Sequence, residues 1–113
     1  MFVTTTFTIE GHEIVDYRGI VRGIVVRSPT LVQGFFGGLK SILGGRIGSY
    51  GRMCEQAREQ AYDLLLEHAR AVGANAIVGL RYDAAEVVSR ESATEVLCYG
   101  TAVVVRPVDR GVA

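Results

Sequence analysis

The side chains that could bind a metal are few in this sequence and lie far apart along it. The chain contains two cysteines, Cys54 and Cys98, and two histidines, His12 and His68. A metal site needs several nitrogen, sulfur or oxygen ligands that converge on one ion, at roughly 2.0–2.6 Å from it. Neither cysteine belongs to a CxxC pattern, which argues against a zinc knuckle and against a disulfide framework. The cysteines and histidines therefore indicate no strong metal-binding motif.

Helical spacing separates the two residues that could otherwise pair as ligands. Cys54 and His68 fall on a similar face of one predicted helix, fourteen residues apart. At about 1.5 Å per residue their backbones lie roughly 21 Å apart, so one subunit cannot bind a single ion with both. Cys98 stands among small apolar neighbours, and we interpret it as a core thiol, because free cysteine is commonly buried.

The densest group of potential ligands lies near the N-terminus and consists of Glu10, His12, Glu13 and Asp16. The start of a strand would scatter these side chains over both of its faces, which favours a solvated acidic edge. A ring of subunits could still gather one residue per copy around its axis. The candidate ligands for a divalent heavy metal are His12, Asp16 and Asp83.

A second candidate site is the glycine-rich segment 44–51, GGRIGSYG. Glycines before a helix expose backbone N–H groups, and the helix dipole favours negative charge there. The segment could hold a phosphate or a carboxylate, or it could form a tight turn packed between subunits, with its arginine paired across the interface. It lacks the GxxxxGK[ST] order of a P-loop. The residues assigned to this ligand or interface turn are Gly44, Gly45, Arg46, Ser49 and Tyr50.

No catalytic motif accompanies these groups. The sequence has no GxSxG, no HExxH and no paired Cys/His spacing. We therefore predict no enzyme and no assured cofactor. The pair Phe35–Phe36, set among glycines, leaves open a third kind of function, a contact with another protein or a membrane surface.

Strands come first among the elements that must position these residues. Alternating β-branched residues predict a long, bent strand over 14–27, preceded by a short strand over 2–7. Gly19 and Gly23 share one parity of the long strand, which predicts a bulge or a close approach of another backbone. A weak helical stripe follows over 31–43.

An apolar stripe at helical spacing predicts a long helix over 52–72, with Ser49 as N-cap and Gly73 as a left-handed residue after its end. Strands are predicted over 76–82 and 94–106. One face of the last strand is small or β-branched and can lie against the alanine-rich stripe of the helix. The residues of that stripe are Met53, Ala57, Ala61, Leu64, Leu65, Ala69 and Val72, and those of the strand face are Val96, Cys98, Gly100, Ala102 and Val104.

This order of strands, helices and strands predicts an α+β fold with a mainly antiparallel sheet. We expect one domain over residues 1–107 and a flexible tail over 108–113. The longest uncharged stretch, residues 28–39, is shorter than the ~20 residues of a membrane-spanning helix. No secretory signal is visible, so we expect a cytoplasmic protein without a transmembrane segment.

Composition points to self-association. The 113 residues carry no net charge, so no global field draws the chain to nucleic acid. The 49% hydrophobic fraction excludes a disordered chain and exceeds what a domain of this size readily buries. We therefore expect a homo-oligomer.

Several short motifs, in this order and spacing, resemble the YbjQ-like family. They are Gly44-Gly45-Arg46, Ser49-Tyr50, Ala57-Arg58, the run from Gly73 to Gly79, and Gly100-Thr101-Ala102-Val103. The similarity covers about residues 4–106. The family consists of small proteins described as heavy-metal-binding and otherwise uncharacterised. The resemblance implies a dodecin-like subunit in a homo-oligomeric ring, a pentamer, and implies no established reaction. The chain departs from some relatives at Gly51, where an acidic residue is frequent, and at Arg18, where some have cysteine.

Overall fold

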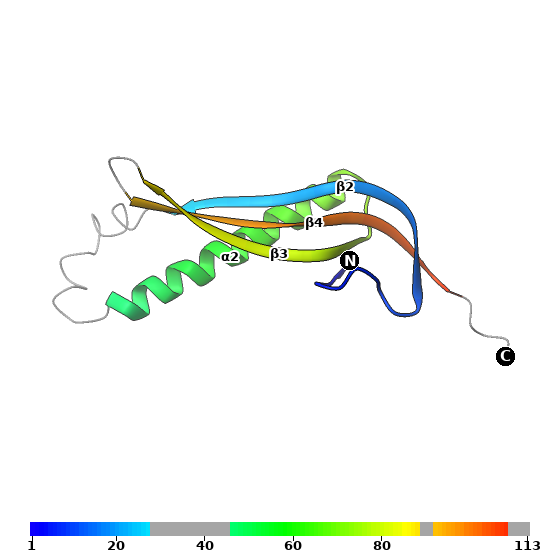
Figure 1. The fold of residues 1–113 in the computed structure, drawn as a ribbon, viewed down its shortest axis with the longest axis horizontal. Coiled ribbons are helices and arrows are strands. Elements are labelled where there is room, and N and C mark those ends of the chain that lie inside the picture. Colours follow the sequence, from blue (N-terminus) through cyan, green and yellow to red (C-terminus); the bar gives the residue numbers. More distant parts are fainter. Residues whose placement is uncertain (28–45, 89–91, 109–113) are drawn as a thin grey trace.

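In the part of the chain that the structure describes, one mixed sheet and one long helix make up the fold. The computed structural model describes residues 1–27, 46–88 and 92–108. The sheet has the order β1-β3-β4-β2, with β1 parallel to β3 and the other neighbours antiparallel (Figure 1). This confirms the predicted α+β class with a mainly antiparallel sheet. The elements are β1 (Phe2–Val3), β2 (His12–Arg27), α2 (Arg46–Ala71), β3 (Ala76–Val88) and β4 (Ser92–Pro107).

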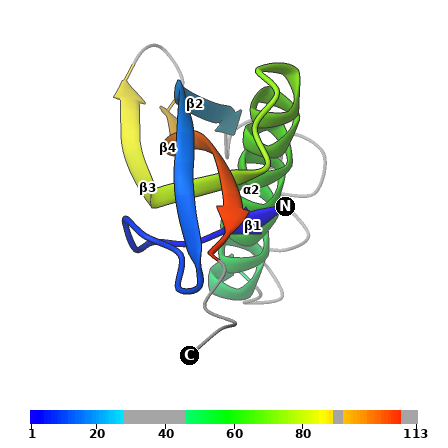
Figure 2. The same cartoon turned by 90° about the vertical axis from the view of Figure 1, so that its right-hand side faces the viewer.

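The main core lies between α2 and one face of the sheet (Figure 2). The predicted small-residue face of β4 packs there. Cys98 and Ala102 are completely buried, Val96 and Gly100 are buried, and Val104 is half-buried. Small side chains on both elements let the helix approach the strands closely, which raises the packing density. The helix contributes Ala57, Ala61, Leu65 and Ala69 to this core, and β2 contributes Val21.

Both glycines of the long strand do what their spacing predicted. Gly19 has a φ of 93° and stands where the pairing of β2 with β4 shifts register. Gly23 faces α2, and a Cβ atom at this position would lie 1.8 Å from the carbonyl oxygen of Ala61. The first glycine therefore forms a bulge, and the second lets the helix backbone touch the strand.

A smaller core covers part of the opposite sheet face, which we call the helix-free face. Ile9 packs there against buried residues of β3 and β4. The chain between β1 and β2 reaches this position by continuing along the edge of β3. Thr4 donates its N–H to the carbonyl of Ile77, and Gly79 donates to that of Thr6. The buried members of this core are Ala76, Val78, Val103 and Val105.

The predicted strand over 2–7 is much shorter in the structure, where β1 comprises only Phe2–Val3. Threonine hydroxyls account for the difference. The Thr4 hydroxyl accepts from the N–H of Thr6, and the Thr6 hydroxyl donates to the carbonyl of Thr8. Such local bonds compete with strand pairing and bend the chain.

The predicted start of the long helix is also wrong. The helix begins at Arg46, so Ser49 lies inside it and is not its N-cap. Glycines 48 and 51 weaken a helix by only about 1 kcal/mol each relative to alanine, which 26 residues of helix tolerate. Its end agrees with the prediction, because Gly73 has a φ of 79°. The helix predicted over 31–43 lies outside the described residues. No helix in the described ranges is long and apolar enough to cross a membrane.

Candidate functional site

Two of the candidate metal ligands lie at the start of β2. The ring of His12 packs against Phe2 at 4.7 Å between centroids, and its Nδ1 donates to the carbonyl of Glu10 at 3.1 Å. A carbonyl can only accept, so Nε2 is the nitrogen left for a ligand. Asp16 forms an ion pair with Arg18 at 3.0 Å. Both candidates are therefore held by neighbours of their own.

The third candidate, Asp83, lies in another part of the sheet. It stands opposite Leu97 on β4, whereas Asp16 stands opposite Val104. Seven residues of strand separate those two positions by roughly 23 Å. In the portion of the chain that the structure describes, no three His, Cys, Asp or Glu side chains lie close enough to hold one metal ion. One copy therefore does not bring the candidates together.

The thiols differ in what they could bind. Cys98 is completely buried, as predicted, and burial raises its pKa. Burial, together with the neighbouring Cys98, raises the pKa of Tyr82 to about 12. Because its pKa is raised, Cys98 stays protonated at neutral pH. Only the thiolate binds metals, so Cys98 is not a metal ligand in this core. Cys54 is half-buried on α2.

The histidine on α2 has a structural partner. The backbone N–H of Arg22 donates to Nδ1 of His68 at 3.2 Å, which ties the helix to β2. This bond uses one ring nitrogen as an acceptor, and it could not have been foreseen, because 46 residues separate the partners.

Part of the predicted ligand or interface turn belongs to the helix. Arg46, Ser49 and Tyr50 lie in the first two turns of α2, and Gly44 and Gly45 lie outside the described residues. The first turn contains no acidic residue. Its free backbone N–H groups and the helix dipole therefore meet no carboxylate from that turn.

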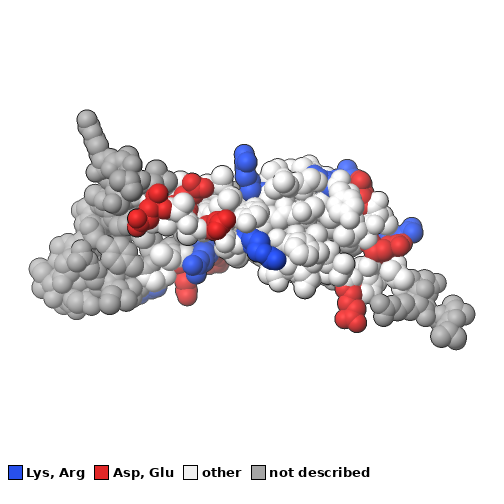
Figure 3. All heavy atoms as spheres, in the orientation of Figure 1, with Lys and Arg blue, Asp and Glu red and all other residues white. Residues whose placement is uncertain are grey.

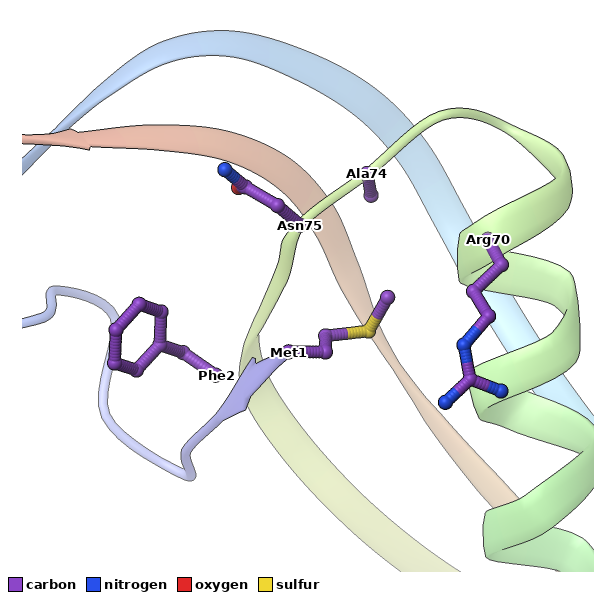
Figure 4. Close-up of a pocket in the computed structure, with 5 residues that line it drawn as sticks. All are labelled: Met1, Phe2, Arg70, Ala74 and Asn75. Carbon is purple, nitrogen blue, oxygen red and sulfur yellow. The ribbon is translucent and has the colours of Figure 1, made fainter.

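An open hollow of about 440 Å³ lies between β1 and the end of α2 (Figure 4). Arg70 extends from the helix on one side, and Met1 reaches toward the helix from the strand. The amide of Asn75 already bonds both backbone groups of Val105, at 2.9 and 2.8 Å. Met1, Phe2 and Ala74 supply the rest of the lining, so Arg70 has the one charged side chain among these lining residues.

The helix-free face carries exposed apolar residues of β2. Strand alternation turns Ile20, Ile24 and Val26 away from the α2 core, and they are 77%, 42% and 58% exposed. Phe7 lies beside Gly79 of β3 and is 72% exposed, and its ring centroid is 5.7 Å from Cζ of Arg81. Sequence reasoning missed this surface, although the parity of the three β2 residues could have indicated it.

Comparison with known proteins agrees with this fold. The YbjQ family, described as "Putative heavy-metal-binding", matches residues 1–106. The chain belongs to the YbjQ family. Two similar relatives, each named UPF0145 protein, come from Legionella pneumophila (strain Corby) and Francisella tularensis subsp. tularensis (strain WY96-3418). The first is 58% identical over 93% of this chain and 98% of its own length, and the second 50% identical over 94% and 100%.

A solved structure shares the architecture of this YbjQ-family protein. It is a protein of unknown function of the DUF74 family from Pediococcus pentosaceus, with a TM-score of 0.63 and 19% identity. The match covers 94% of this chain and 98% of the other. At this identity the likeness concerns the fold.

Proposed function

We propose that this YbjQ-family protein works as a homo-oligomeric ring, a pentamer of dodecin-like subunits in the cytoplasm, that binds a heavy-metal ion and catalyses no reaction. The observation that carries the assembly is the exposed apolar helix-free face, led by Ile20, Ile24 and Val26. Large apolar side chains exposed together on one face often mark a site of contact with another protein. Copies of the chain are the partner we assign to it.

The metal part of the proposal rests on the family description and on the separation of the candidate ligands. Within one described copy no metal group forms, so the ligands must come from several copies. His12 keeps Nε2 free, and imidazole nitrogen is a common ligand of zinc, copper and nickel. A symmetric ring places equivalent side chains around one axis. Asp16 and Asp83 are the further candidates.

Zinc binding by variants tests this proposal. Light scattering after a sizing column is expected to give an oligomer at micromolar concentration, and elemental analysis less than one ion per subunit without added metal. In dialysis against Zn²⁺, His12→Ala should lose at least about tenfold in affinity, because removing one ligand weakens every equivalent position. The matched control is His68→Gln, which keeps an acceptor for Arg22. A monomeric protein would refute the proposed ring. Zinc binding by His12→Ala as tight as that of the wild type would refute the role of His12 as a ligand.

A second candidate function is the binding of a small anion at the start of α2. The absence of acidic residues from the first turn favours it. Arg46→Ala is then expected to reduce the binding of inorganic phosphate at least about tenfold, since one charge-assisted contact contributes ~1.5–3 kcal/mol. Isothermal titration measures the binding, and light scattering checks the mass. If the variant dissociates the oligomer instead, the segment is an interface turn and this function is wrong.

A further inference from the structure

The helix-free face combines apolar flanks with a band of positive charge. Arg22 and Arg81 lie on either side of Tyr99 in one cross-strand row. Figure 3 shows basic side chains near the middle of the molecule and acidic ones toward both of its ends, with further basic ones at the right-hand end. In the described ranges, the ion pairs are Arg18–Asp16 and Arg106–Glu13. Neither guanidinium of the row therefore has a carboxylate partner among the described residues, although Nη1 of Arg81 donates to the carbonyls of Thr5 and Leu80.

The outer surface of α2 carries a row of acidic side chains, with the exposed Arg52 and Arg70 near the two ends of that row. Four carboxylates follow one another at intervals of four residues, which makes three like-charge pairs on the helix. Each such pair disfavours an isolated helix by about 0.2–0.5 kcal/mol. No ion pair within the described part of the chain relieves them. A cation from outside the subunit would. The four residues are Glu55, Glu59, Asp63 and Glu67.

A hollow in this outer surface has room for a cationic side chain. It measures about 400 Å³ and is lined by Gln56, Glu59, Gln60 and Asp63. Arg27 donates to the Oε1 atom of Gln60 beside it. Two carboxylates and two amides offer acceptors to a guanidinium, which has five N–H donors. The chemistry of the lining thus matches an arginine that enters from solvent.

Ring symmetry determines which surfaces can meet. A closed ring of five needs a head-to-tail contact, in which one surface of a subunit meets a different surface of the next. The helix-free face therefore cannot pair with itself in such a ring. The outer surface of α2 lies on the other side of the subunit (Figure 2). The arginines of one row and the carboxylates of the other are complementary in charge, and the two surfaces point in opposite directions, as a repeating contact requires.

We propose that α2 of one copy docks on the helix-free face of the next, with Arg22 and Arg81 pairing with Glu59 and Asp63. This inference rests on the proposed ring. The spacing is compatible, since Arg22 and Arg81 lie two strands apart, about 10 Å. Glu59 and Asp63 lie about 6 Å apart along the helix, within reach of long side chains. Ile20 and Ile24 would become buried around this polar centre, as in other protein interfaces.

Charge reversal on each surface tests the pairing. One variant is Arg22→Glu/Arg81→Glu, and the other is Glu59→Arg/Asp63→Arg. Alone, each is expected to lower the affinity between subunits at least about 100-fold, because like charges then face each other across the contact. Combined in one chain, the four substitutions should restore association, because every contact of the ring then pairs opposite charges again. Glu13→Arg/Arg106→Glu, which exchanges the partners of an existing pair, is the matched control and should keep the wild-type mass. Circular dichroism verifies that all variants are folded.

The outcomes separate this inference from the ring itself. A monomeric wild-type protein refutes both. A wild-type oligomer whose two variants keep the same mass refutes only the pairing. Dissociation of the sheet-face variant without that of the helix variant shows that the helix-free face meets another surface, which also refutes the pairing. Dissociation of both variants, followed by recovery in the variant that combines all four substitutions, supports it.

Discussion

Gly23→Ala is expected to destabilise the protein by about 3 kcal/mol, near the upper end of the usual cost of overpacking. The added methyl carbon would lie 1.8 Å from the carbonyl oxygen of Ala61 and 2.8 Å from the backbone nitrogen of Leu65. Both are backbone atoms of α2, so no side chain can rotate away. The helix must then move off β2. Chemical denaturation measures the loss, which corresponds to a fall in Tm on the order of 10 °C.

Gly51→Ala is the matched control for this substitution. Position 51 lies inside α2, and an added Cβ there would meet nothing within 4 Å. Alanine should raise stability by up to about 1 kcal/mol, because it favours the helix over the unfolded chain. Both variants are compared at one protein concentration, since the stability of an oligomer depends on it. A Gly23→Ala protein as stable as the wild type would show that helix and strand do not touch here.

The contact between helix and sheet was predictable because it leaves a local signature in the sequence. Close backbone approach requires the absence of a side chain, and Gly23 stands at the required parity of a β-branched strand. The small side chains of Cys98 and Ala102 on one face of β4 also indicate a close approach of the helix. Periods of two and of 3.6 residues assign such positions to one face of an element. The residue pattern therefore predicts which face of the helix lies close to which face of the sheet.

Other features depend on pairing partners that no local pattern specifies. The parallel pairing of β1 with β3 joins Phe2 to Ala76, far away in sequence. The end of β1 is decided by hydroxyl bonds among threonines, whose strand preference points the other way. The start of α2 depends on how well a long helix tolerates internal glycines.

The candidate site was harder to predict than the fold. Residue types identified His12, Asp16 and Asp83 as possible ligands. Whether these side chains lie close together depends on how the strands of the sheet pair. The register of β4 separates Asp83 from the other two. If equivalent residues of several copies form the site around an axis, their positions depend on how the copies contact one another. That contact cannot be derived from the sequence of one chain. The acidic spacing on α2 is the local signal that comes nearest to showing it.

Neighbouring leucines on α2 show where periodicity alone was wrong. The apolar stripe assigned both Leu64 and Leu65 to the buried side of the helix. In the structure Leu65 is fully buried, whereas Leu64 is 42% exposed. Successive helix residues differ by about 100° in direction. The sheet therefore covers Leu65 fully, whereas Leu64 lies at the edge of the contact between helix and sheet.

Leu65→Ala is accordingly expected to cost about 2–5 kcal/mol, because it removes a buried side chain and leaves a cavity that the sheet cannot fill. Leu65 packs in the core that contains Val21, Cys98 and Ala102. These small neighbours belong to paired strands, so they cannot move far enough to fill the cavity. Leu64→Ala, the adjacent control, should cost less than about 1 kcal/mol, since an exposed substitution loses little burial. Urea unfolding of both variants gives the two values. Equal losses would place both leucines in the same environment and contradict the observed rotation of α2 over the sheet.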